Sequence, residues 1–93
     1  MRESILQSKV MRYLRAKGIY ARKLHDMYTA GLGDILVIID GAAIFIELKS
    51  DTGKLSKIQA WEAARVREAG GIYCVCRTLE QVKEAVCGIE RQG

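Results

Sequence analysis

Two short apolar runs joined by Asp40-Gly41 constrain the fold of this chain more than any other feature. The runs are Ile35–Ile39 and Ala42–Ile46, and both are rich in strand-forming residues. Asp-Gly between two such runs is the strongest short-range signal for a β-hairpin with a two-residue turn. Such a turn places Ile39 opposite Ala42, which sets the register of the whole hairpin.

This register brings charged residues together at the far end of the hairpin. Asp34 falls opposite Glu47, with the two side chains roughly 5 Å apart on one face. Like charges so placed destabilise a sheet unless a cation lies between them. Lys49 follows Glu47 by two residues and therefore points to the same face. Two carboxylates and an ammonium group in this arrangement predict a metal site with a catalytic lysine.

The hairpin is apolar on both faces, so helices must cover both sides of the sheet. Ser56 and Gln59 form a capping-box pattern at the start of one such helix, on which Trp61 is expected to be a core residue. The other expected elements are a helix over Glu3–Lys17, a weak strand over Ile19–His25, a loop over Thr29–Gly33, the capped helix up to Gly70-Gly71, a strand over Ile72–Arg77, a short helix from the Thr78 cap to about Cys87, and a frayed tail over Glu90–Gly93.

The predicted fold is therefore α/β, in the order αβββαβ followed by a last helix, with a mixed central sheet flanked by helices. The helix between the hairpin and the last strand predicts a parallel, right-handed crossover. The 93 residues are enough for a single core, which gives one domain over residues 1–93.

Composition narrows the class of protein. A net charge of +4 favours an anionic partner, with nucleic acid first. Three cysteines, an odd number, argue for a reducing compartment, and we interpret Cys74, Cys76 and Cys87 as small buried hydrophobic residues. The apolar runs are too short to span a membrane, and the amino terminus lacks a signal-peptide pattern. We therefore expect a soluble, cytoplasmic protein without a membrane partner or an organic cofactor.

The motifs together resemble those of a known nuclease family. They are Glu3 in the first helix, Gly31-x-Gly33-Asp34 before the hairpin, Ile46-Glu47-Leu48-Lys49, Leu55-Ser56-x-x-Gln59-x-Trp61, Gly70-Gly71 and a strand that ends at Arg77. This order resembles the PD-(D/E)XK nuclease superfamily, whose fold is that of restriction endonucleases. The closer resemblance is to the virus-type replication-repair nuclease branch, VRR-NUC, in its stand-alone, phage-like form.

One residue departs from the family pattern. The residue before the aspartate is often proline in the family, whereas here it is Gly33. Proline would stiffen the entry to the strand, while glycine permits more backbone shapes. This substitution concerns the rigidity of the Asp34 loop rather than the ability of Asp34 to bind metal.

The resemblance implies a metal-dependent nuclease. Asp34 and Glu47 would hold Mg²⁺ or Mn²⁺, which prefer such oxygen ligands, and the backbone carbonyl of Leu48 would contribute by resemblance. The metal would acidify a water and polarise the phosphate, and Lys49 would orient that water or stabilise charge. The alternative interpretation is an ordinary ion-pair cluster at a strand end.

Glu3 and Gln59 have two interpretations each, and Gln7 is a further candidate for the role of Glu3. Glu3 suits the first turn of a helix dipole, while the resemblance implies an acidic partner that reaches the metal, directly or through water. Gln7 follows one turn later on the same helix face. Gln59 suits a capping box, and the family places a glutamine here beside the catalytic lysine.

Basic residues suggest where a DNA backbone would lie. Lys54 and Lys57 flank the Ser56 cap, where lysines and helix N–H groups can contact phosphate; the alternative is ordinary solvated lysines. Arg22, Lys23 and His25 could line a DNA track on the first strand. A lone histidine such as His25 is more often structural or exposed than catalytic.

We expect a structure-specific DNA endonuclease, because so small a domain has little surface with which to read bases. The resemblance implies a symmetric homodimer that cuts branched DNA such as four-way (Holliday) junctions, of phage or prophage origin and acting in a bacterial host cell. A two-fold dimer would match a two-fold substrate. The alternatives are a flap, single-strand or restriction-type nuclease of the same fold, and a catalytically inactive nucleic-acid-binding module.

Overall fold

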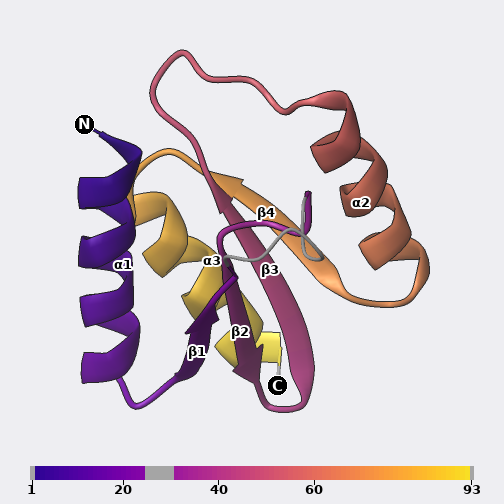
Figure 1. Cartoon of the computed structure of the whole chain (residues 1–93). Coiled ribbons are helices and arrows are strands. Elements are labelled where there is room, and N and C mark those ends of the chain that lie inside the picture. The colour runs from indigo at the N-terminus through magenta and orange to yellow at the C-terminus, as the bar shows by residue number, and fades with distance from the viewer. Residues whose placement is uncertain (1, 25–30, 93) are drawn as a thin grey trace.

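The computed structural model describes residues 2–24 and 31–92, which form three helices and one four-stranded sheet (Figure 1). Their bounds are α1 (Glu3–Ala16), β1 (Tyr20–Lys23), β2 (Ile35–Ile39), β3 (Ala42–Leu48), α2 (Lys57–Glu68), β4 (Ile72–Cys76) and α3 (Leu79–Gln92). His25 lies outside the described residues. The expected order of elements is confirmed.

The strand order in the sheet is β1-β2-β3-β4. β1 pairs antiparallel with β2, β2 antiparallel with β3, and β3 parallel with β4, so the mixed sheet and the crossover through α2 are confirmed. Ile39 faces Ala42, as the Asp-Gly turn predicted. Asp40 and Gly41 both have positive φ, at 49° and 82°, which a two-residue turn of this type requires.

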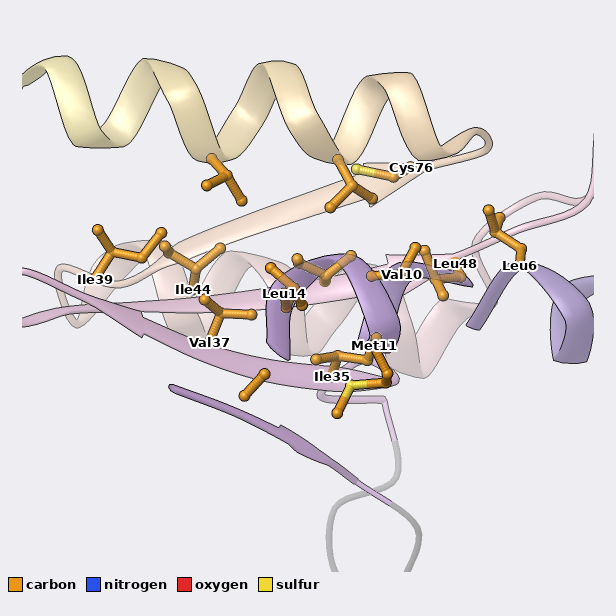
Figure 2. Packing of buried hydrophobic residues seen from close by; sticks show 14 residues of the cluster. Leu6, Val10, Met11, Leu14, Ile35, Val37, Ile39, Ile44, Leu48 and Cys76 are labelled. Carbon is orange, nitrogen blue, oxygen red and sulfur yellow. The ribbon is translucent and has the colours of Figure 1, made fainter. Parts of the chain in front are cut away.

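α1 and α3 cover one face of the sheet and enclose the main core (Figure 2). Alternate residues of β2 and β3 point into it, because successive strand side chains face opposite ways. Shortening one of these buried side chains to alanine would cost roughly 2–5 kcal/mol. The core consists of Leu6, Val10, Met11, Leu14, Ala21, Ile35, Val37, Ile39, Ile44, Ile46, Leu48, Cys76, Val82 and Val86.

α2 covers the other face of the sheet over β3 and β4. Its Ala63 and Val66 pack on Tyr73 in a second, smaller core. On the same sheet face, Tyr20 of β1 and Ile38 of β2 remain exposed. The prediction that helices cover both faces therefore holds only in part, because α2 is a single short helix.

The core position expected for Trp61 is wrong, because its side chain is 59% exposed. Trp61 precedes the buried Ala63 by two residues, which is about 200° around a helix axis. Its ring therefore points away from the sheet and lies 5.4 Å from the guanidinium of Arg65, one turn later.

The last helix is longer than expected. The sequence predicted an end near Cys87 and a frayed tail, but α3 continues to Gln92. Two tertiary contacts hold the extra turn: Ile89 packs against the main core, and Glu90 forms an ion pair with Lys17 of α1 at 3.3 Å. Neither contact can be predicted from the local sequence of α3, because both involve residues far away in the chain.

The cysteines are free thiols, and Cys76 is buried in the main core, as expected of a small hydrophobic residue. Burial raises the pKa of the Cys76 thiol to about 12. Cys74 and Cys87 are partly buried. No helix in the described ranges is both long and apolar enough to cross a membrane.

Candidate active site

The open end of the hairpin forms a cavity of about 390 Å³. The register that pairs Ile35 with Ile46 brings Asp34, just before β2, beside Glu47 near the end of β3. Lys49 follows directly after β3. The cavity is lined by Glu3, Ser4, Gln7, Asp34, Glu47, Leu48 and Lys49. Residues from α1, the Asp34 loop and β3 therefore meet at one site.

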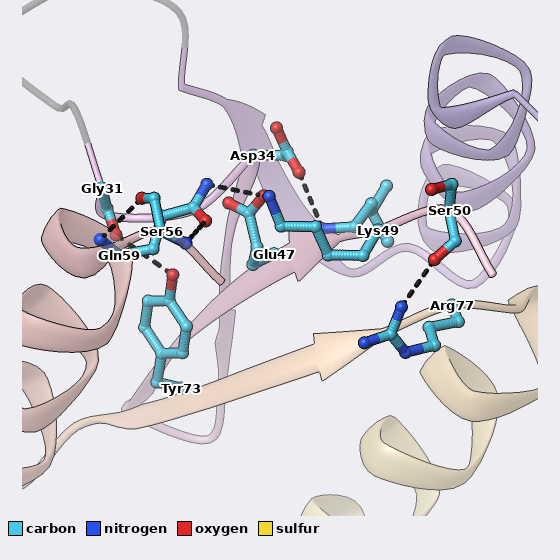
Figure 3. A network of polar contacts seen from close by, with 10 residues as sticks. Gly31, Asp34, Glu47, Lys49, Ser50, Ser56, Gln59, Tyr73 and Arg77 are labelled. Atoms are coloured by element: carbon cyan, nitrogen blue, oxygen red, sulfur yellow. Dashed lines mark hydrogen bonds and ion pairs between the residues drawn. The ribbon is translucent and has the colours of Figure 1, made fainter. Parts of the chain in front are cut away.

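Short polar contacts hold both carboxylates (Figure 3). Oδ2 of Asp34 accepts a hydrogen bond from the backbone N–H of Leu48 at 2.7 Å. Oε2 of Glu47 accepts one from Nε2 of Gln59 at 3.2 Å and lies 3.5 Å from Nζ of Lys49. Each carboxylate thus uses one oxygen, Oδ2 of Asp34 and Oε2 of Glu47, in these contacts.

Glu47 is the one charged residue in the buried part of the described structure, with 5% of its surface exposed. Burial, together with the charge of Asp34, raises its pKa from 4.5 to about 7 against the opposing effect of Lys49. A negative charge here is costly without a second cation nearby. The site therefore favours the binding of a positive ion.

This donor set suits a hard divalent cation such as Mg²⁺ or Mn²⁺, which binds through one or two carboxylates and keeps several waters. Asp34 and Glu47 would hold it, together with the carbonyl of Leu48. Within residues 2–24 and 31–92, no three His, Cys, Asp or Glu side chains lie close enough together to bind one ion. Glu3 lines the cavity without completing such a cluster.

Gly33 shapes the approach to Asp34. Its φ of +110° is open to glycine but closed to proline, whose ring holds φ near −65°. A Cβ atom at Gly33 would lie 3.0 Å from the carbonyl oxygen of Ile46, which accepts the N–H of Asp34 at 2.8 Å. The departure from the family pattern thus corresponds to a backbone path that proline could not follow.

Two solved structures of known proteins share the fold of this chain. The chain is similar to a solved structure described as "VRR_NUC domain", with 29% identity and a TM-score of 0.77, over 90% of this chain and 92% of that one. A second, described as "VRR_NUC domain protein", has a TM-score of 0.86 at 17% identity, over 100% of this chain and 91% of that one. This chain has the VRR-NUC fold. No protein-family model and no curated protein sequence matched it.

The VRR-NUC fold implies a nuclease of the PD-(D/E)XK superfamily. The fold class expected from the sequence is thereby confirmed. The likeness to these structures concerns the whole domain, so the individual site residues rest on the geometry of the cavity.

Gln59 combines the two interpretations that its position allowed. Its Oε1 accepts the backbone N–H of Ser56 at 2.8 Å, and the Ser56 hydroxyl accepts the backbone N–H of Gln59 at 3.2 Å. This reciprocal pair is a complete capping box. Because Oε1 is held by the cap, Nε2 is turned toward Glu47. The cap of α2 therefore orients a hydrogen-bond donor into the VRR-NUC site.

The first helix of the VRR-NUC domain contributes the opposite wall. Glu3 and Gln7, one turn apart, both line the cavity with Asp34 and Glu47. The spacing had placed them on one helix face, and the structure shows that this face meets the hairpin end. Glu3 is also the one acidic residue in the first turn of α1, so its position still suits the helix dipole.

Sequence reasoning missed Tyr73 as a residue that holds the site together. Its hydroxyl donates to the carbonyl of Gly31 at 3.1 Å, which ties β4 to the loop before Asp34. Burial, together with the charges of Glu47 and Asp34, raises the pKa of Tyr73 to about 12. A Cβ atom at Gly31 would lie 2.9 Å from the carbonyl of Ile58, so this loop also packs closely on α2. In the sequence, the one signal for this role of Tyr73 was a tyrosine within an otherwise apolar strand.

Arg77 was noted only as the end of the last strand. Its guanidinium donates to the carbonyl of Ser50 at 2.6 Å, and the N–H of Lys49 donates to the carbonyl of Cys76 at 3.1 Å. These two hydrogen bonds connect Lys49 and Ser50, which follow β3, to the end of β4.

The four basic residues predicted to contact DNA lie in different places. Lys54 and Lys57 are exposed on either side of the α2 cap. Lys23 shares the face of β1 that points to α1, where it lines a second cavity. Arg22 lies on the opposite face, with its guanidinium 4.6 Å from the ring of Tyr20. Arg22 and Lys23 therefore lie on opposite faces of the sheet.

Proposed function

We propose that this VRR-NUC domain is a metal-dependent, structure-specific DNA endonuclease that hydrolyses phosphodiester bonds. The observation that carries the proposal is one cavity that holds a buried glutamate, a second carboxylate and a lysine on a nuclease fold. Structural ion-pair clusters seldom bury a carboxylate beside another carboxylate, because the arrangement is unfavourable without a further cation.

Asp34, Glu47 and the carbonyl of Leu48 would bind Mg²⁺ or Mn²⁺, and Glu3 would act from the opposite wall, directly or through water. When bound, such an ion lowers the pKa of water and stabilises negative charge on a phosphoryl group. Asp34 is held for this role by the Leu48 N–H, and Glu47 by Gln59.

Lys49 would act on the reacting phosphate. Its ammonium group lies 3.5 Å from Glu47 and lines the cavity. It would orient the attacking water and stabilise charge on the phosphate oxygens. Water adds to phosphorus, one P–O bond breaks, and the products are a phosphate monoester and a free hydroxyl.

For the substrate, we propose branched DNA such as a four-way junction, cut by a symmetric homodimer. A domain of this size offers little surface for base reading, so the shape of DNA is the feature that it can recognise. The support for a dimer is a group of large exposed apolar side chains around α2 and the uncovered part of the sheet: Tyr20, Ile38, Ile58 and Trp61. Exposed apolar surface of this kind often marks an interface.

The test is cleavage of a labelled four-way junction, a flap, a single strand and a linear duplex, each with Mg²⁺, Mn²⁺ or EDTA. Lys49→Ala is the active-site variant. Lys83→Ala, on the exposed side of α3, removes the same charge away from the cavity and serves as the matched control. Metal-dependent cleavage that Lys49→Ala loses and Lys83→Ala keeps is the expected result.

The same panel separates the alternatives. Symmetric nicks in the junction arms support the branched-DNA proposal, and preferred cutting of flap or single-strand DNA would replace it with another nuclease of the same fold. Binding without cleavage in either metal, equal in wild type and Lys49→Ala, would leave only a nucleic-acid-binding module. Light scattering of Ile38→Lys tests the dimer, because a charge in an apolar interface should yield a monomer.

A further inference from the structure

A second cavity, of about 320 Å³, is lined by the same helix, α1, that lines the active-site cavity. It is formed between α1 and the end of β1. We call it the basic groove, and its lining is Ser8, Met11, Arg12, Arg15 and Lys23. Three of these five residues are cations, and none is acidic.

Two connections link the basic groove to the active site. Along α1, Gln7 lines the active-site cavity and Ser8, the next residue, lines the groove. Across the sheet, Lys23 pairs with Ile35, the neighbour of Asp34, and the N–H of Leu24 donates to the carbonyl of Asp34 at 2.9 Å. A strand of nucleic acid bound at Asp34 could therefore continue directly into the groove.

The three cations of the basic groove differ from two lysines elsewhere in the protein, which form ion pairs. Lys17 forms an ion pair with Glu90, and Lys49 with Glu47. Across residues 2–24 and 31–92, no ion pair involves Arg12, Arg15 or Lys23. Three like charges around one hollow repel one another, and an anionic ligand would relieve that repulsion.

We propose that the basic groove binds backbone phosphates of the DNA strand that is cut, a few nucleotides from the scissile phosphate. This inference rests on the proposed nuclease function and deepens it. Arginine binds phosphate through two parallel N–H···O bonds, and lysine binds it as a point charge. Phosphate contacts fix the position of DNA without reading its sequence, which suits an enzyme that recognises shape.

The position of the basic groove along α1 gives its distance from the active-site cavity. Arg15 lies about two turns beyond Gln7, or roughly 12 Å along the helix axis. One strand of DNA advances about 3.4 Å per phosphate, so the groove reaches roughly three phosphates away from the cavity. Lys54 and Lys57 lie by α2, at the other side of the active site, so the cut strand would have contacts on both sides.

The first test measures DNA binding by the intact protein as a function of salt, by fluorescence anisotropy in EDTA, which prevents cleavage. Arg12→Ala, Arg15→Ala and Lys23→Ala should each weaken binding to all sequences alike. Each should also reduce the slope of log K against log salt by about 1. Lys9→Ala, on another flank of α1, is the matched control and should leave the slope unchanged.

The arginines of the groove are exposed, and arginine and alanine have similar helix propensities, so these variants should fold. Circular dichroism melting checks this. The second test is cleavage of a strand with one neutral methylphosphonate, placed in turn at each position around the scissile bond. In wild type, cleavage should fall when the neutral group lies about three phosphates from the scissile bond on one side. In Arg15→Ala, the neutral group at that position should not lower the cleavage rate below that of the variant with unmodified DNA.

The outcomes separate the two proposals. Wild type that cleaves DNA, with groove variants that keep the salt slope of Lys9→Ala, would overturn the basic groove and leave the nuclease intact. Wild type that neither binds nor cleaves any DNA in Mg²⁺ or Mn²⁺ would overturn both. A reduced slope with position-dependent methylphosphonate loss supports the groove as a phosphate site.

Discussion

Gln59 connects the cap of α2 to Glu47 through a single amide group. Its Oε1 accepts the Ser56 N–H at 2.8 Å while its Nε2 donates to Glu47 Oε2 at 3.2 Å. An amide can satisfy both contacts because it has an acceptor and a donor, whereas a carboxylate has only acceptors. Helix capping and the orientation of a proposed metal-binding residue therefore depend on the same side chain.

We predict that Gln59→Glu keeps the helix cap and impairs the site. Glutamate can still accept the Ser56 N–H, so stability should change little. Its charge would face Glu47 in place of the amide donor, and metal affinity or kcat/KM should fall roughly 10–100-fold. The measurements are metal titration and cleavage kinetics. Gln81→Glu, at the equivalent position of the α3 cap, should leave both unchanged; equal loss in the two variants would contradict the prediction.

Ser56→Ala should affect stability and activity together. Loss of an N-cap hydroxyl costs about 1 kcal/mol of unfolding free energy, and here it also frees Gln59 to turn away from Glu47. Thr78→Ala removes the comparable cap bond of α3, where the Thr78 hydroxyl accepts the Gln81 N–H at 3.1 Å. Denaturant unfolding should show similar losses for both variants, and only Ser56→Ala should slow cleavage. A comparable slowing in Thr78→Ala would mean that activity follows global stability instead.

The buried Glu47 predicts a specific pH dependence of the metal-free protein. Burial, together with the charge of Asp34, raises its pKa from 4.5 to about 7 against the opposing effect of Lys49. Between these values the folded state binds more protons than the unfolded state, so the free energy of unfolding should fall as pH rises across this window. Denaturant unfolding in EDTA from pH 4 to 8 measures it.

Glu47→Gln is the control for that titration, because glutamine carries no ionisable proton and should flatten this part of the profile. Divalent metal should act oppositely in wild type, since its binding releases the proton and becomes stronger toward pH 7 and above. An unchanged profile in Glu47→Gln would assign the pH dependence to another group.

Gly33→Ala should displace Asp34. An alanine would meet a φ of +110° and place its Cβ 3.0 Å from the carbonyl of Ile46, which accepts the Asp34 N–H. We expect a stability loss of about 1–3 kcal/mol and a clear loss of cleavage. Gly70→Ala is the matched control, with a φ of +90° and open space around the site of the new Cβ. It should lose stability without losing activity per folded molecule.

Local sequence signals predicted the parts of the site that lie on one hairpin and one helix cap. The Asp-Gly turn set the register that brings Asp34 beside Glu47, and the two-residue period of a strand placed Lys49 with Glu47. The Ser56–Gln59 spacing predicted a capping box in full. These features depend on bonds between residues close in the chain, which is why sequence alone sufficed for them.

Packing between distant elements decided the rest. Whether Trp61 is buried depends on which side of α2 meets the sheet, and the sequence pattern favoured the wrong side. The length of α3 depends on contacts of Ile89 with the core and of Glu90 with Lys17. The sequence alone determined the hairpin and the two carboxylates it brings together. Only the tertiary structure decided that Glu3 and Gln7 face them, and that Arg12 and Arg15 join Lys23 in one groove. The physical reason is that a local period fixes which residues share a face, while burial of apolar surface between elements fixes what that face meets.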